Sequence, residues 1–177
     1  MVSLKLAASL FPSQVPNYPH RQVVTNLYDA IARYRRMRPG VVLSYGGGSQ
    51  FQLGLPGMIT GRNPDLGVVS RGTPKDWRGR TSPALVAEVV SRVSVNRDYQ
   101  SKREEYHAFG LLEYWIVDPL KRQVTVLSRR GDVWHEAVFR EGQVIVSLVL
   151  PGFATTVAEL WIDVDEDDQD DPGANGA

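Results

Sequence analysis

Glu88 lies inside the apolar run formed by residues 84–90, and no other residue restricts the fold of this chain as strongly. A short run of this kind predicts a buried strand. A carboxylate in such a strand is costly unless it is paired or binds a metal. Asp65 opens a second apolar run at residues 66–69, and Lys102 lies on a helix-like stretch further along. We therefore expect the fold to bring a partner to Glu88, with Asp65 and Lys102 as candidates for the same site.

Two segments have apolar residues at helical spacing. The first covers residues 23–34 and predicts an amphipathic helix. The second runs over residues 96–109, where Asn96 can cap the helix and Gly110 can end it in a left-handed conformation. Lys102 falls on this second helix.

Short apolar or alternating runs predict the strands, and residues 157–160 a final turn. The expected strands are residues 41–43, 50–53, 66–69, 85–90, 114–117, 124–127, 133–139 and 144–150. The triplet Gly46-Gly47-Gly48 is expected to be a hairpin turn, because a phosphate-binding loop would continue into Gly-Lys-Ser/Thr and a helix. Helices placed before and between the strands predict an α/β sandwich with a mixed sheet.

The charges balance at 20 basic and 20 acidic residues, but they are unevenly distributed. Seven of the acidic residues fall within residues 163–171. We expect residues 163–177 to be an acidic, disordered tail and residues 1–162 to be a single domain. The remaining body is basic and rich in arginine, which suits phosphate contacts, although a solvated basic face explains the same composition.

Composition also excludes several classes of site. The chain has no cysteine, so disulfides, zinc–thiolate sites and thiol nucleophiles are excluded. No apolar run approaches the roughly 18 residues of a membrane span. We expect a cytoplasmic protein with no membrane partner.

Two carboxylates and a lysine suit the hydrolysis of a phosphodiester. Mg²⁺ (or Mn²⁺) takes oxygen ligands from one or two carboxylates, keeps several waters, and can activate one of them. Asp65 and Glu88 could supply these oxygens, with the backbone carbonyl of Val89 as a third ligand. Lys102 could stabilise developing negative charge or orient the water. The simpler alternative is that Asp65 is a turn residue and that Glu88 forms a structural ion pair with Arg97, Lys102 or Arg103.

Five segments, in a fixed order, carry a family resemblance. They are Pro64-Asp65, Glu88-Val89-Val90-Ser91, Arg97-Asp98-Tyr99-Gln100-Ser101-Lys102, Glu105-Tyr106 and Glu113-Tyr114-Trp115-Ile116-Val117-Asp118-Pro119. Together they resemble the Uma2 family, also called DUF820, of the PD-(D/E)XK nuclease superfamily. The resemblance implies a restriction-endonuclease-like core, a central mixed β-sheet flanked by α-helices. It also implies a Mg²⁺-dependent endonuclease acting on DNA, and a homodimer is a further expectation.

The resemblance assigns roles to individual residues. Asp65 matches the first metal ligand of the family and Glu88 the second. The superfamily lysine normally stands two residues after the glutamate, where this chain has Val90. The resemblance implies that the helix supplies the lysine instead, and Lys102 matches that place.

Three further residues are weaker candidates. His20 matches a histidine at the start of the first helix of the family, although a capping or surface role also fits it. Asp98 and Tyr106 could support the site or simply order the helix. The chain departs from the family in having little of the acidic, turn-rich segment before the first helix, and in having Leu111-Leu112 where a Val-Pro pair is common.

Two other functions stay open from the sequence. One is a catalytically inactive nucleic-acid-binding or regulatory module that retains the nuclease fold. The other is an interaction protein that dimerises through the edge of its sheet. Fold analogy alone does not decide between them.

Overall fold

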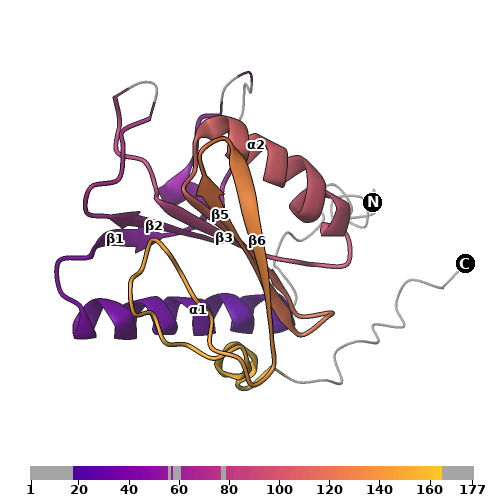
Figure 1. Cartoon of the computed structure of the whole chain (residues 1–177). Helices are drawn as coiled ribbons and strands as arrows, with labels where there is room; N and C mark the ends of the chain where they lie inside the picture. The colour runs from indigo at the N-terminus through magenta and orange to yellow at the C-terminus, as the bar shows by residue number, and fades with distance from the viewer. Residues whose placement is uncertain (1–17, 56, 58–60, 77–78, 165–177) are drawn as a thin grey trace, which may run out of the picture.

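The computed structural model describes residues 18–55, 57, 61–76 and 79–164. Its centre is a six-stranded mixed sheet whose spatial order repeats the chain order, β1-β2-β3-β4-β5-β6 (Figure 1). Only β3 and β4 pair in parallel; the other neighbours are antiparallel. The strands are β1 (Val42–Gly46), β2 (Leu66–Ser70), β3 (Leu85–Val89), β4 (Glu113–Asp118), β5 (Gln123–Arg130) and β6 (Val133–Arg140).

Helices cover the two faces of this sheet. The long helix α1 (Tyr18–Met37) lies against one face, and α2 (Lys102–Phe109) lies against the other (Figure 1). A π-helical turn, η2 (Arg97–Ser101), leads directly into α2, so that the parallel connection from β3 to β4 runs through both. This arrangement confirms the predicted α/β class with a mixed sheet flanked by helices.

The sheet separates two hydrophobic cores. On the α1 side, Leu27 and Ile31 are fully buried in a cluster with Trp115 of β4. On the α2 side, Tyr106 is buried in a cluster with Tyr114 of the same strand. Successive residues of a strand point to opposite faces, so even and odd positions of β4 supply different cores. The same alternation decides on which face a buried glutamate lies.

The predicted strand at residues 50–53 is wrong. Those residues begin in a short 3₁₀ helix, η1 (Gly48–Phe51), and β1 pairs with β2 instead. The ring of Phe51 packs over Gly67 of β2, where a Cβ atom would come within 2.4 Å of the ring. The glycine triplet is therefore not a hairpin turn, because no strand follows it to pair with β1.

The predicted strand at residues 144–150 is also wrong. The segment forms one isolated bridge, between Val144 and Thr156. Ser147 Oγ and the Leu148 amide instead donate hydrogen bonds to the side chain of Glu113, at 2.6 and 2.8 Å. The Glu113 carboxylate thus accepts the backbone amide of Leu148, which in a strand would have bonded to a neighbouring strand.

The ends of the second helix are predicted with mixed success. Gly110 is left-handed, with φ 88°, as expected. Asn96 has helical backbone angles and makes no capping hydrogen bond with its side chain. The Ser94 carbonyl already accepts the amide of Asp98 at 2.8 Å, so the helical geometry begins before Asn96.

Two further features concern the rest of the chain. The expected final turn appears as the 3₁₀ helix η3 (Ala158–Trp161), and most of the predicted acidic tail lies outside the described residues. No helix in the described part of the chain is long and apolar enough to cross a membrane.

Candidate functional site

The structure brings Asp65, Glu88 and Lys102 together at one end of β2 and β3. Leu66 pairs with Ala87 across these antiparallel strands, so Asp65, just before β2, lies beside Glu88. The Asp65 amide donates to Glu88 Oε2 at 3.4 Å. Lys102, the first residue of α2, places its Nζ atom 3.0 Å from the same oxygen. Residues separated by up to 37 positions in sequence thus share one site.

Glu88 is almost completely buried, with 3% of its side chain exposed. Its Oε1 atom accepts a hydrogen bond from Tyr106 Oη at 2.6 Å. Burial, with a smaller contribution from the nearby Asp65 charge, raises the pKa of Glu88, and Lys102 and the Tyr106 hydrogen bond lower it; the net pKa is about 7. Glu88 therefore lies in a site that lacks enough positive charge to hold it fully ionised at neutral pH.

Asp65 is held by groups from two different elements. Its Oδ2 atom accepts the Val89 amide at 2.8 Å and lies 3.2 Å from Nε2 of His20, at the start of α1. Burial alone would raise the pKa of Asp65, but these hydrogen bonds and the His20 charge lower it overall. Burial has the opposite effect on His20 and would lower its pKa. The hydrogen bond and the charge of Asp65 outweigh burial, so the pKa of His20 is raised overall. His20, a weak candidate from sequence, thus directly contacts a central candidate.

Lys102 lies between two buried carboxylates. Its Nζ atom is 2.7 Å from Asp98 Oδ1 as well as 3.0 Å from Glu88. Asp98 also accepts a hydrogen bond from Ser94 Oγ, and its backbone carbonyl accepts one from Tyr114 Oη at 3.0 Å. Asp98 lies in the π-helical turn η2, and turns of this kind are frequent at functional sites. The turn fixes Asp98, and Asp98 holds the lysine beside Glu88.

The other basic residues near Glu88 in sequence have different positions. Arg103 pairs with Glu136 at 2.7 Å, and Arg97 is exposed. Of the three basic residues considered as partners of Glu88, Lys102 is the one that pairs with it. The ion-pair alternative therefore describes part of the geometry without explaining why a second carboxylate, Asp65, lies beside it.

Sequence reasoning missed two contributors to this site. The Cα atom of Gly47 approaches Asp65 so closely that a Cβ atom would lie 2.1 Å from the Asp65 carbonyl oxygen and 2.6 Å from Tyr28 Oη. Arg62 forms a bidentate pair with Glu105 of α2, at 2.6 and 2.7 Å. The glycine triplet is a sequence signal for the close approach of Gly47. Nothing local in the sequence indicates the Arg62–Glu105 pair.

The charge of the site suits a divalent cation. Three carboxylates, Asp65, Glu88 and Asp98, face one ammonium group and one histidine. Asp65 keeps 25% of its side chain exposed, so an ion could reach the carboxylate pair from that side. Among the described residues no group of three or more histidine or acidic side chains forms a ready metal cage. Mg²⁺ needs no such cage, since it commonly binds one or two carboxylates and retains its waters. The predicted third ligand, the Val89 carbonyl, stays a prediction.

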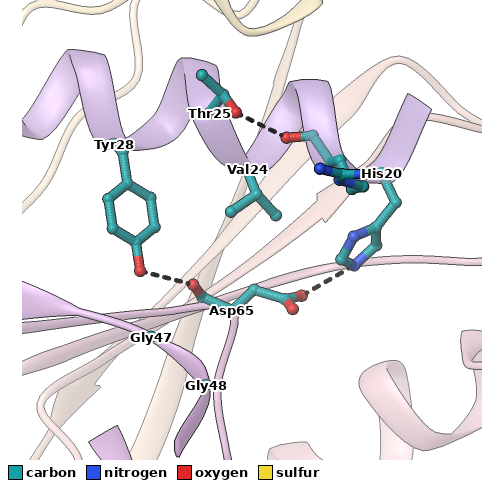
Figure 2. A pocket seen from close by; sticks show the side chains of 8 residues that line it. His20, Val24, Thr25, Tyr28, Gly47, Gly48 and Asp65 are labelled. Carbon is teal, nitrogen blue, oxygen red and sulfur yellow. Dashed lines mark hydrogen bonds and ion pairs between the residues drawn. The ribbon is translucent and has the colours of Figure 1, made fainter. Parts of the chain in front are cut away.

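A hollow opens beside Asp65. It has a volume of about 350 Å³ and lies between α1 and the Gly47-Gly48 segment (Figure 2). His20 and Asp65 form one end of it, and Val24 and Tyr28 project toward it from α1 (Figure 2). Solvent and ligands can therefore reach Asp65 along α1.

The family comparison matches most of the chain. The profile of the Uma2 family, described as "Putative restriction endonuclease", matches residues 9–158. The chain belongs to the Uma2 family. All of the predicted site residues, from His20 to Tyr106, fall within the matched residues.

A solved structure supports the fold of this Uma2 protein. A crystal structure from Anabaena variabilis, described as a putative nuclease belonging to DUF820, matches with a TM-score of 0.62. The match has 14% sequence identity and covers 83% of this chain and 82% of that chain. At this identity the likeness shows a shared fold. A search of curated proteins finds no match.

Proposed function

We propose that this Uma2 protein is a Mg²⁺-dependent endonuclease that hydrolyses phosphodiester bonds of DNA. The observation that carries the proposal is the meeting of Asp65, Glu88 and Lys102, with Lys102 supplied by the helix. Family membership supports a nuclease, and the basic body of the chain supports a polyanionic substrate.

Asp65 and Glu88 would hold the cation, which when bound supplies charge neutralisation for the phosphate and an activated water. The raised pKa of Glu88 supports this role, because a dication would provide the positive charge that Lys102 alone does not. The Val89 amide and His20 keep Asp65 ionised and fix the direction of its carboxylate.

Lys102 would act on the phosphate or on the attacking water. Its ammonium group carries three donors and, held by Asp98, can keep one contact while it offers another. A preorganised positive charge of this kind stabilises the negative charge that develops in the transition state. Val90 at the usual lysine position leaves this task to α2.

The proposal is tested by cleavage of supercoiled plasmid DNA and matched RNA with Mg²⁺ or Mn²⁺. Glu88→Gln should reduce DNA cleavage by about 100-fold or more, because it removes a charged metal ligand and keeps the side-chain volume. Glu104→Gln, on an exposed position of α2, is the matched control and should cleave normally. Undiminished cleavage by Glu88→Gln would disprove the site assignment, and equal cleavage of RNA would disprove the DNA assignment.

Metal binding can be tested without catalysis. Added Mg²⁺ or Mn²⁺ should raise the melting temperature of the wild-type protein, because a ligand that binds only the folded state stabilises it. The gain should disappear in Asp65→Asn and Glu88→Gln. A protein that binds DNA in a salt-dependent way yet cuts with neither metal would instead be an inactive module that keeps the nuclease fold.

A further inference from the structure

The hollow beside Asp65 has the size and the defined walls of a ligand-binding site. Its volume of about 350 Å³ falls in the range of small-ligand sites. One wall is the face of α1 that presents Val24 and Tyr28, and the opposite wall is the backbone of Gly47 and Gly48 (Figure 2). Asp65 also lines the hollow, so a ligand in it lies next to this carboxylate, which itself adjoins Glu88.

The aromatic wall is fixed in position. The ring of Tyr28 packs edge-to-face on Tyr45, with centroids 5.9 Å apart and planes at 63°. The hydroxyl group of Tyr28 donates to the Asp65 carbonyl at 3.4 Å. Two contacts at different points hold the ring, so the wall exists before a ligand arrives.

The opposite wall must remain free of side chains. Gly47 packs so closely against Asp65 and Tyr28 that a Cβ atom would collide with both. Gly48 is left-handed, with φ 58°, and its amide donates to the Pro64 carbonyl at 2.8 Å. The two glycines therefore expose their backbone to the hollow. The hydrogen bond from Gly48 fixes this backbone to Pro64, the residue before Asp65.

The chemistry of these walls suits a flat, partly apolar group attached to an anion. Val24 and Tyr28 offer apolar and aromatic surface, on which a nucleobase stacks readily. Arg21 also lines the hollow and is exposed, so its guanidinium group can meet a phosphate. A base inside a duplex is stacked and paired and cannot enter such a space unless it leaves the helix.

We propose that this hollow binds one unpaired nucleobase next to the phosphodiester that is cut. The inference rests on the proposed nuclease function and adds a substrate class to it. The preferred DNA is single-stranded, or a duplex that carries an unpaired nucleotide at the cleavage site. Tyr28 and Val24 hold the base, Arg21 holds the neighbouring phosphate, and the next phosphate lies at Asp65.

The first experiment uses the wild-type protein with three oligonucleotides of one sequence. They are a fully paired duplex, the same duplex with one unpaired nucleotide, and that second duplex with the unpaired base removed to leave an abasic sugar. We expect kcat/KM to be about tenfold or more higher for the unpaired nucleotide than for the other two, given the usual strength of base stacking on aromatic side chains. Equal rates on all three would overturn the inference and leave the nuclease function intact.

Two variants test the location. Val24→Trp places a large side chain in the hollow and should remove the preference for the unpaired base. Met37→Trp adds the same side chain at the other end of α1, where Met37 is 61% exposed, and should keep the preference. A preference that survives Val24→Trp in a folded protein would place the base elsewhere.

A final measurement does not depend on cleavage. Titration of the metal-free protein with a deoxynucleoside monophosphate, followed by amide NMR, should shift the signals of Val24, Thr25, Gly47 and Gly48. If no DNA is cut but these signals shift, the proposed function fails and the base site stands. If they do not shift at millimolar ligand, the base site fails whatever the nuclease assays show.

Discussion

Glu88 and Glu113 are both buried glutamates on the two parallel strands of the sheet, yet their surroundings differ in kind. Glu88 lies on the α2 face near the end of β3, and Glu113 lies at the start of β4 on the α1 face. Glu113 is 0% exposed and accepts hydrogen bonds only from neutral groups among the described residues. These donors are Trp115 Nε1 at 2.7 Å, Ser128 Oγ at 3.2 Å, Ser147 Oγ at 2.6 Å and the Leu148 amide at 2.8 Å.

The difference teaches how a buried carboxylate can be assigned to structure or to function. Glu113 has four neutral donors for its two oxygens and ties the irregular segment around Ser147 to the sheet. Glu88 has two neutral donors, the Tyr106 hydroxyl and the Asp65 amide, together with a lysine and a second carboxylate beside it. A second negative charge adds nothing to stability, so the pair Asp65–Glu88 is explained best by a ligand that brings positive charge.

The largest expected effect on stability is at Glu113. Glu113→Ala should lower the free energy of unfolding by about 3–5 kcal/mol, because it leaves several buried donors without an acceptor. Urea denaturation measures the loss, and Glu141→Ala, at a side chain that is 60% exposed, is the control. A loss below about 1 kcal/mol would mean that Glu113 is not the anchor described here.

The second effect is a dependence of the free energy of unfolding on pH, caused by the titration of Glu88. Its pKa rises from 4.5 to about 7 on folding, so folding favours the protonated form. The resulting stability is fully present below about pH 4.5 and is lost as the pH rises through about 7, by up to about 3 kcal/mol in the metal-free protein. The raised pKa of His20 adds to the same fall, whereas the lowered pKa of Asp65 acts only in acid, below its ordinary value of 3.8.

Urea denaturation of the metal-free protein between pH 5 and pH 8 measures this fall. Glu88→Gln should remove most of it, because glutamine does not titrate. Glu141→Gln, the exposed control, should leave it unchanged. A slope that is equally steep in Glu88→Gln would assign the titration to another group.

A smaller effect, on kcat, tests whether Asp98 positions Lys102. Asp98→Asn should reduce kcat by about tenfold with little change in KM, because the lysine loses the charge that positions it while the substrate surface stays the same. Asp29→Asn, on an exposed position of α1, serves as the control. A change confined to KM would contradict a positioning role for Asp98.

The smallest expected effects come from a matched pair of hydroxyl deletions. Tyr106→Phe removes a hydrogen bond to Glu88, and Ser147→Ala removes one to Glu113, so each should cost about 1 kcal/mol. Only Tyr106→Phe should also move the pH-dependent fall to higher pH, because the Tyr106 hydrogen bond lowers the pKa of Glu88. If Ser147→Ala moved it as well, the two glutamates would be coupled through the sheet.

The sequence predicts most of the sheet because each of those strands pairs with a neighbour close in the chain. It also predicts the meeting of Asp65 with Glu88, since both adjoin apolar runs that form adjacent strands. The sequence also offers Lys102 as a candidate, but its place beside Glu88 follows only from the family resemblance, because a lysine on a helix has no local signal of its direction.

The errors have a common physical cause. Residues 144–150 alternate like a strand, but Ser147 and Leu148 bond to Glu113, 34 and 35 positions earlier. Residues 50–53 alternate as well, but Phe51 fills the space over Gly67. Glu113 belongs to one of the segments that carry the family resemblance, and nothing in its local sequence indicates an anchor. In each case a side-chain contact between distant residues overrides a local pattern.

The agreement between strand order and chain order has a consequence for how the protein forms. Each new strand adds to the edge left by the one before, and no strand must insert between two others. Such a sheet can grow from its first hairpins with small losses of chain entropy, which favours fast folding. The long-range step is the docking of α1 against η3, where Asn26 Nδ2 donates to the carbonyls of Leu160 and Ile162, at 3.0 and 2.8 Å. On the ribosome, the contacts among Asp65, Glu88 and Lys102 can form once α2 has emerged, whereas this docking must wait for residue 162.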